Sequence, residues 1–244
     1  MNDIYKNGLA SMPPLPPPLD AAFVRAAGGG GKRERTQAAL IQAAVQVYAA
    51  RGVGAATMQE VAQVAGVTPG TVYNHFASRE ALLERVGLAV AVGLCEAIAE
   101  SYGEITDGAE RMAIGQRRYV WLAAVSPQWV LLLLDVLNAS PGVAAGLQRY
   151  PLADLRLGVK QKHFKVPSED AAMDAINGIC IQAMLRVARG AAPRNHDVAA
   201  ASLVLRALGM PPAQAAEVAS RPLPPLRLAT PPAPASAAAR RRRS

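Results

Sequence analysis

The stretch TMQEVAQVAGVTPGTVYNHFASREALL, residues 57–83, decides the architecture of this chain. Thr57 is a good N-cap, and Glu60 three residues later completes a capping box at the start of a helix. Apolar residues then recur at helical spacing until Gly66, where the helix must end because a residue without Cβ takes a positive φ easily. Thr68 caps the helix that follows. The stretch therefore predicts two short helices joined by a tight turn.

The second of these helices is predicted to expose a polar face. Pro69 takes its first position, where the missing N–H costs nothing, and Val72 and Phe76 face inward one turn apart. The residues that remain outward are Thr71, Tyr73, Asn74 and His75. This set is rich in hydrogen-bonding groups and poor in charge, as expected of a helix that lies against base edges and phosphates. The pattern indicates a helix-turn-helix that presents this helix to the major groove of DNA.

Two longer helices are expected on either side of the motif. The first begins near residue 32 and ends about Arg51, and its inward stripe is Ile41, Ala44, Val45 and Tyr48. Ser78 caps the second, which is expected from Arg79 to about Tyr102. That helix is on the order of 35 Å long at 1.5 Å per residue, enough to connect the helix-turn-helix to the rest of the chain.

Residues 35–83 resemble the DNA-binding domain of the TetR family of bacterial transcriptional regulators. The resemblance is carried by Tyr48-Ala-Ala-Arg-Gly52, by Gly66-Val-Thr-Pro-Gly-Thr-Val-Tyr-Asn-His-Phe76 and by Ser78-Arg-Glu-Ala-Leu82. It covers about a fifth of the chain, and glycines, caps and core positions agree together. Val61 stands where isoleucine is usual and Arg79 where lysine is usual, so the cation is kept.

The resemblance implies an all-α protein with an N-terminal three-helix DNA-binding domain and a helical C-terminal domain for ligand binding and dimerisation. Its expected partners are double-stranded DNA, a second copy of itself and an unknown small-molecule effector. The two long helices near residues 168–190 and 195–209 would form a four-helix bundle between subunits; the alternative is that their apolar stripes are monomer core. The expected function is a ligand-responsive homodimeric repressor in the bacterial cytoplasm, released from a near-palindromic operator by an apolar or aromatic effector.

Eleven residues are predicted to contact the operator. They are Lys32, Arg33, Arg35, Thr57, Thr68, Gly70, Thr71, Tyr73, Asn74, His75 and Arg79. The basic residues at the start of the first helix are expected on phosphates or in the minor groove, whereas Tyr73 and Arg79 are expected on phosphates. Asn is well suited to adenine, but the choice between Asn74 and His75 as the base-reading residue stays open.

The net charge of +8 says less about DNA than the motif does. The net charge is zero over residues 1–31 and 87–220, +2 over 32–86 and +6 over 221–244. The excess therefore belongs to the C-terminal end, where four arginines follow one another at 240–243. A solvated basic tail is the favoured interpretation, and salt-sensitive attraction to phosphates is the alternative.

Composition predicts four parts in the chain. Residues 1–31 combine PPLPPP with four consecutive glycines and are expected to be a disordered arm. Residues 32–86 form the helix-turn-helix domain, 87–220 the effector-binding and dimerisation domain, and 221–244 a disordered basic tail. Apolar residues make up 51% of the chain and aromatic residues 5%, which favours helices packed through Leu, Val and Ala. The apolar runs are shorter than the roughly 18 residues that span a bilayer, so no membrane segment is expected.

The sequence favours no enzyme, cofactor or metal site. The three histidines are far apart, and neither a glycine-rich phosphate loop nor a GxSxG elbow is present. Cys95 and Cys180 lie in apolar stripes and are expected to be reduced, with a redox switch as a minority alternative. Candidate effector-binding residues are Tyr102, Met112, Tyr119, Trp121, Trp129, Phe164 and Met173, although core packing explains most of them equally well.

Two other functions are compatible with the same sequence. One is a regulator that has no small-molecule effector and acts constitutively or through a partner protein. The other is a sequence-tolerant DNA-compacting protein that uses the arginine-rich end. The effector-free regulator would show no ligand-induced change in melting temperature, whereas the favoured repressor would. Removal of residues 221–244 would abolish DNA binding by the compacting protein but leave that of an operator-specific regulator nearly intact.

Overall fold

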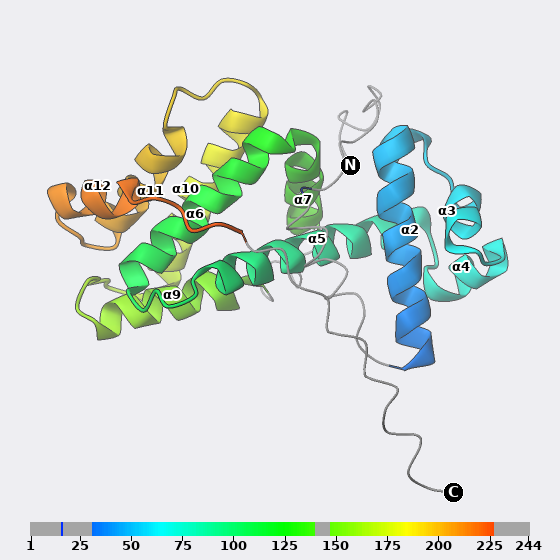
Figure 1. Cartoon of the computed structure of the whole chain (residues 1–244), viewed down its shortest axis with the longest axis horizontal. Coiled ribbons are helices and arrows are strands. Elements are labelled where there is room, and N and C mark those ends of the chain that lie inside the picture. The colour runs from blue at the N-terminus through cyan, green and yellow to red at the C-terminus, as the bar shows by residue number, and fades with distance from the viewer. Residues whose placement is uncertain (1–15, 17–30, 140–146, 227–244) are drawn as a thin grey trace, which may run out of the picture.

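The computed structural model describes residue 16, residues 31–139 and residues 147–226, and every regular element in this part is a helix. The helices are α2 (Lys32–Ala55), α3 (Met58–Ala65), α4 (Pro69–His75), α5 (Arg79–Ser101), α6 (Gly108–Val125), α7 (Pro127–Ala139), α9 (Arg149–Lys160), α10 (Glu169–Ala188), α11 (His196–Ala207) and α12 (Pro212–Ser220). They form two lobes, α2 to α4 in one and α6 with α9 to α12 in the other, and α5 runs between them (Figure 1). The all-α prediction is confirmed.

The caps predicted for the small lobe are present. The Thr57 hydroxyl accepts a hydrogen bond from the backbone N–H of Glu60. In return, the Glu60 carboxylate accepts a hydrogen bond from the backbone N–H of Thr57. Gly66 ends α3 at a φ of 67°, and the Thr68 hydroxyl caps α4 by accepting from the N–H of Thr71. Both short helices therefore have their exposed N-terminal amides satisfied within one turn of sequence.

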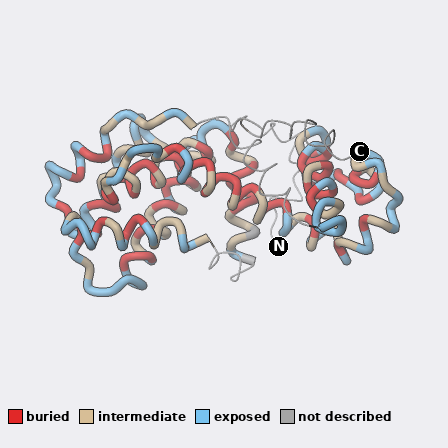
Figure 2. Tube along the Cα trace, turned by 60° about the horizontal axis from the view of Figure 1, so that its bottom comes forward, coloured by how far each residue is buried: buried red, intermediate tan, exposed pale blue. Residues whose placement is uncertain are grey.

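The core of the small lobe comes from the inward faces predicted for its helices. α2 contributes the predicted Ala44 and Tyr48 and also Leu40, all at most 1% exposed, and these pack in one cluster with Val72 of α4 and its C-cap Phe76. Buried positions, drawn red, gather in the interior of this lobe in Figure 2. α3 and α4 lie on the side of α2 that faces away from the second lobe (Figure 1), so the core holds α4 at the outer end of the molecule.

Helix α5 belongs to both lobes. Its first half buries Leu82, Val86 and Val90 in the core of the small lobe, whereas Leu94 and Ile98 in its second half pack with α6, α7 and α10. One rigid element therefore begins at the end of the helix-turn-helix and ends inside the large lobe.

A second connection between the lobes was not predicted. Trp129 and Leu132 of α7 are buried in the same apolar cluster as the inward residues of α2 to α5. Trp129 is the largest fully buried side chain of the described chain and is 1% exposed. Through these two residues α7, which stands beside α5 in Figure 1, joins the apolar cluster of the small lobe.

Glycines bring α6 and α9 unusually close together. A Cβ on Gly108, at the start of α6, would lie 2.5 Å from the backbone nitrogen of Gly158 in α9. A Cβ on Gly158 would lie 2.3 Å from the ring of Phe164. These contacts leave no space for a side chain, so the two glycines set the separation of α6 and α9 at this end.

The C-terminal end joins the body for longer than the sequence predicted. A disordered tail was expected from residue 221, but residues 221–226 lie along α6. Arg117 donates to the carbonyl oxygen of Arg221 over 2.6 Å, and Arg118 donates to the carbonyl oxygen of Pro224. The reason is that two adjacent arginines of α6 satisfy backbone carbonyls that proline-rich chain cannot pair with itself. The remainder of the predicted tail, and nearly all of the predicted arm at 1–31, lie outside the described residues.

Helix α10 has small residues on both its buried and its exposed sides. Ala172 and Ala183 are buried within this chain. Gly178 on the same helix is exposed, as is Leu203 of α11, which is 50% exposed despite its apolar side chain. Within the described residues, no helix is long and apolar enough to cross a membrane.

Candidate DNA-binding face and effector pocket

The outer face of α4 carries the polar residues that the sequence placed there. Tyr73 is 53% exposed, Asn74 is exposed, and Thr71 and His75 are half-buried. The hydroxyls of Thr68 and Thr71 lie 3.0 Å apart and hydrogen bond to each other at the start of the helix. The helix therefore offers an aromatic hydroxyl, an amide and an imidazole in consecutive positions, which is the chemistry that base edges and phosphates accept.

The basic residues at the start of α2 are solvent-accessible. Lys32, Arg33 and Arg35 are all exposed in the first turn. The same turn is closed by Glu34, whose carboxylate accepts from the N–H of Gly31 over 2.7 Å. Gly70, at the start of α4, has only the Thr68 side chain near the position of a Cβ, so the backbone is open on that side.

Arg79 has a contact inside the domain that the sequence did not predict. Its guanidinium donates to the carbonyl oxygens of Val53 and Gly54, at the end of α2. An arginine beside the last carbonyls of a helix is favourable because those oxygens carry the negative end of the helix dipole. The side chain therefore ties the first residue of α5 to the end of α2, and its phosphate contact stays a prediction.

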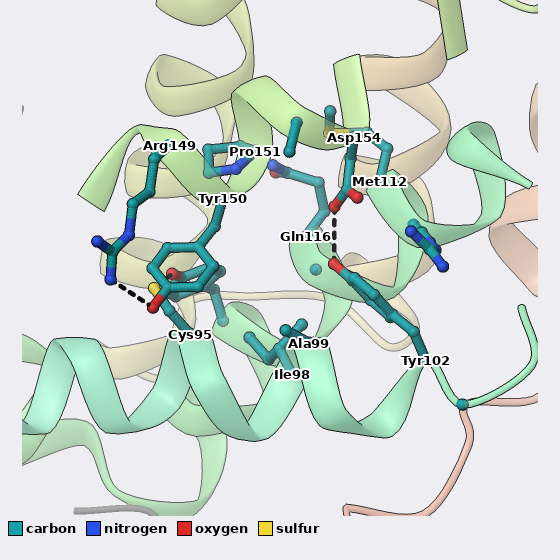
Figure 3. A pocket seen from close by; sticks show the side chains of 15 residues that line it. Cys95, Ile98, Ala99, Tyr102, Met112, Gln116, Arg149, Tyr150, Pro151 and Asp154 are labelled. Carbon is teal, nitrogen blue, oxygen red and sulfur yellow. Dashed lines mark hydrogen bonds between the residues drawn. The ribbon is translucent and has the colours of Figure 1, made fainter. Parts of the chain in front are cut away.

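A pocket of about 500 Å³ lies in the large lobe between α5, α6 and α9. Its lining is Cys95, Ile98, Ala99, Tyr102, Gly103, Arg111, Met112, Gly115, Gln116, Tyr119, Arg149, Tyr150, Pro151, Ala153 and Asp154. The volume is within the range of pockets for small organic ligands, and apolar and aromatic side chains dominate the lining. The wall formed by α5 belongs to the helix that begins at the DNA-binding domain (Figure 3).

One end of the pocket is organised around a buried acid. The Tyr102 hydroxyl donates to Oδ2 of Asp154 over 2.7 Å, and Figure 3 shows the two side chains pointing at each other from α5 and α9. Asp154 is 6% exposed, and burial raises the pKa of its carboxyl to about 6 although the Tyr102 hydrogen bond and the Arg111 charge oppose the rise. The Arg111 guanidinium lies 5.1 Å from the centre of the Tyr102 ring. The carboxyl is thus mostly ionised at neutral pH.

The other end of the pocket carries a thiol, two phenols and a cation. The Cys95 sulfur and the Tyr119 hydroxyl lie 2.8 Å apart. Burial raises the pKa of Cys95 to about 11, so the group is a neutral thiol rather than a nucleophilic thiolate. Arg149 donates to the Tyr150 hydroxyl over 2.9 Å. This end therefore offers an arginine near the surface and hydrogen-bonding hydroxyls deeper inside.

Gln116 lies in the wall between these two ends (Figure 3). The side chain is on α6, the residue is 4% exposed, and its buried Oε1 atom has no hydrogen-bond partner. An unpaired buried amide oxygen costs about 1–3 kcal/mol, because it has given up water without gaining a donor. The oxygen itself is inaccessible to solvent, so it lies behind the surface of the pocket and not where a ligand atom reaches it.

Three of the seven predicted effector-binding residues meet in this pocket. They are Tyr102, Met112 and Tyr119. The structure places the other four elsewhere. Trp121 packs against the apolar cluster of α5, α6, α7 and α10, with the Arg118 guanidinium 5.7 Å from its ring centre, and Trp129 belongs to the cluster that forms the core of the small lobe. Phe164 and Met173 are buried in the core formed by α6 and α9 to α12.

The polar members of the pocket were missed, although the sequence carried a signal for two of them. Asp154 shares the inward face of α9 with Leu155 and Gly158, and Gln116 shares that of α6 with Met112 and Ala113. A polar residue within an apolar stripe is the informative exception to burial rules. Arg149 gave no such signal, because it is an exposed cation at the start of a helix.

Asp154 is expected to make stability depend on pH. Its folded-state pKa of about 6 lies above the ordinary 3.8, so folding favours the protonated acid and this contribution is lost as pH rises through 6. Replacing Asp154 by asparagine removes that loss. In urea denaturation, the free energy of unfolding of Asp154→Asn should rise relative to that of the wild type by about 2 kcal/mol between about pH 4.5 and 7.5. Asp174→Asn, at an exposed position on α10, should follow the wild type; parallel curves for both variants would contradict the assignment.

Each of the two lobes matches a known protein family. Residues 40–86 match the family described as bacterial regulatory proteins, tetR family, and residues 107–221 match a family described as tetracyclin repressor-like, C-terminal domain. The curated relatives match only a short stretch of this chain. The HTH-type transcriptional regulator SrpR of Pseudomonas putida is 43% identical over 53 residues, 22% of this chain and 25% of the relative. The repressor KstR2 of Rhodococcus jostii is 32% identical over 71 residues, 29% of this chain and 31% of the relative. The chain thus matches less than a third of these relatives.

Solved structures match both lobes together. RolR in complex with resorcinol is 27% identical to this chain, covers 80% of it and 98% of its own length, and superposes with a TM-score of 0.64. RolR without ligand is 25% identical, covers 78% of this chain and all of its own, and has a TM-score of 0.61. The regulator FadR from Bacillus subtilis, with stearoyl-CoA, is 18% identical over 70% of this chain and 97% of its own with a TM-score of 0.54, a likeness of fold alone.

Proposed function

This chain belongs to the TetR family of bacterial transcriptional regulators, and we propose that it is a homodimeric repressor that a small effector releases from its operator. The observation that carries the proposal is the position of α5. Its N-terminal residue, Arg79, is bonded to the end of α2, and its C-terminal turn forms a wall of the pocket. A ligand that shifts this helix changes the position of the DNA-binding helices.

The DNA-binding part of the proposal rests on α4. A single helix of seven residues offers too few contacts for tight and specific binding, so two copies are required. In a symmetric dimer the two α4 helices enter successive major grooves of a near-palindromic site, about one helical turn apart. The eleven predicted contacts stay predictions, with Asn74 and His75 as the candidates for reading a base.

The dimer is proposed through α10 and α11. Gly178 and Ala171 leave part of α10 without large side chains, and Leu203 exposes an apolar side chain on α11. Helices of this kind can pack closely across a symmetry axis and cover the exposed leucine. Since repressors of this design act on chromosomal DNA, the protein is expected to work in the bacterial cytoplasm.

The pocket favours an effector over constitutive action. A lining that is largely apolar and contains a buried unpaired amide oxygen at Gln116 is poorly explained as structural core. RolR, the similar protein, was solved with resorcinol, a small aromatic diol. We therefore propose a small aromatic effector, and a coupling of about 1–3 kcal/mol, or 5- to 150-fold in operator affinity, is sufficient for release.

Selection from random duplexes at about 0.15 M salt tests the proposal, because loose phosphate binding is screened there. The purified chain should enrich an inverted repeat whose half-sites lie one helical turn apart. A chain ending at Leu226 removes the arginine run and keeps the segment that contacts α6. It should select the same repeat. Unrelated sequences whose binding vanishes with salt, and with this truncation, would replace the proposal by the DNA-compacting alternative.

A further inference from the structure

The hydrogen bond between Tyr102 and Asp154 joins two elements that the chain separates by 52 residues. Tyr102 is the C-cap of α5, and Asp154 is at the buried face of α9. Within the described residues no other donor is bonded to this carboxylate. This buried, charge-assisted hydrogen bond therefore holds the end of α5 to the large lobe, in addition to the packing of Leu94 and Ile98 and the Cys95–Tyr119 contact.

The protonation states of the two groups suit this role. Burial raises the pKa of Tyr102 well above its usual range, and the neighbouring Asp154 charge raises it further. The phenol therefore remains a donor, and the carboxylate is the acceptor. Because the bond lies in the wall of the pocket, a ligand that enters can offer its own donor to the same carboxylate. A carboxylate can accept several hydrogen bonds, but a ligand donor that takes the Oδ2 position displaces the Tyr102 hydroxyl from it.

The charges around the pocket restrict the ligand that can do this. Arg111 and Arg149 both line the pocket with Asp154, so the lining carries an excess of positive charge. An amine would be repelled by the two guanidinium groups, whereas a neutral hydroxyl is not. The site therefore favours a ligand that has a hydroxyl donor and no positive charge, and its apolar and aromatic lining favours a ring.

We propose that the Tyr102–Asp154 hydrogen bond is a latch that keeps α5 in its operator-binding position, and that the effector opens it. The effector is an aromatic ring without positive charge that carries a hydroxyl group, and this hydroxyl donates to Oδ2 of Asp154 in place of Tyr102. This inference rests on the proposed function and adds to it the class of the effector and the contact through which it acts. Latch closure and effector binding exclude each other, so each weakens the other by the same factor.

The first test breaks the latch without a ligand. Tyr102→Phe keeps the ring and removes the hydroxyl, so operator affinity should fall at least about fivefold and affinity for the effector should rise. The control is Ser101→Ala, which removes a hydroxyl from the preceding residue that bonds only within α5, to the carbonyl oxygen of Ile98. Operator titrations should leave this control within about twofold of the wild type. Equal operator affinities for Tyr102→Phe and the wild type would overturn the latch.

The second test uses two rings that differ only in their donors. Resorcinol should raise the melting temperature of the full chain and weaken its binding to the selected operator. 1,3-Dimethoxybenzene has the same ring and no donor, and it should do neither. Equal effects of the two compounds, or no effect of either resorcinol or catechol, would overturn the proposed effector class.

The selected operator separates failure of this inference from failure of the proposed function. If the wild-type chain enriches no inverted repeat, the repressor proposal itself fails. If it does enrich a repeat and Tyr102→Phe binds that repeat like the wild type, the repressor proposal stands and the latch fails. Tyr102→Phe and the wild type should have the same helical content by circular dichroism, so a loss of affinity reports on the position of α5 and not on unfolding.

Discussion

Replacing Trp129 by alanine is expected to lower the free energy of unfolding by about 3–5 kcal/mol, the range for deleting a large buried aromatic side chain. Trp129 is 1% exposed and lies where α7 meets the core of the DNA-binding lobe. Its removal loses the transfer free energy of the indole and leaves a cavity between the two lobes. Urea denaturation followed by circular dichroism measures the loss. A domain of typical stability would retain only a few kcal/mol.

Trp121 provides a matched control, because the chain has only these two tryptophans. Trp121 is half-buried and lies near the Arg118 guanidinium. Trp121→Ala should therefore cost about 1 kcal/mol, the typical size for a partly exposed position. Similar losses for the two variants would contradict the assignment of Trp129 to the connection between the lobes.

Replacing Asn74 and His75 together by alanine is expected to abolish operator recognition while leaving the fold intact. Neither side chain is buried, so the change in stability should be small. Loss of a good base contact costs about 1–3 kcal/mol, and a dimer loses it twice, which corresponds to about 30-fold or more in operator affinity. Fluorescence anisotropy with the selected operator measures the change, and the two single variants then identify which residue reads the base.

The control for this prediction also removes an amide side chain from the DNA-binding lobe. Gln46 is exposed on α2 and is not among the predicted contacts. Gln46→Ala should bind the operator like the wild type. If the Asn74 and His75 variant kept wild-type affinity, α4 would not be the reading helix, although the helix-turn-helix itself would remain.

The DNA-binding lobe could be predicted almost completely from its sequence. Thr57, Gly66 and Thr68 take the capping and turn roles expected of them, and Val72 and Phe76 face the core. These features depend on residues within one or two helical turns of each other, where spacing alone decides which side chains meet. Arg79 is the exception, because its partners at the end of α2 lie about 25 residues away and cannot be read from a local pattern.

The effector pocket could be predicted only in part. Aromatic residues of the large lobe were reasonable candidates, but Trp129 and Phe164 are core, while Tyr102 and Tyr119 line the pocket. Residue type does not distinguish the two cases, because a large apolar side chain is suited to either. An aromatic residue lines the pocket only where the helix opposite does not fill the space in front of it. Whether that space stays open depends on the separation of α6 and α9.

The sequence by itself determined the helices of the DNA-binding lobe, the exposed polar face of α4 and the length of α5, because caps and periodicity act over a few residues. The tertiary structure alone decided that Asp154 faces Tyr102, that Gln116 has an unpaired oxygen in the pocket wall, and that residues 221–226 belong to the body. Each of these depends on how helices distant in sequence pack. The distance between α6 and α9, for example, is short because Gly108 and Gly158 have no side chains there. The local sequence around a glycine does not reveal which residue packs against it.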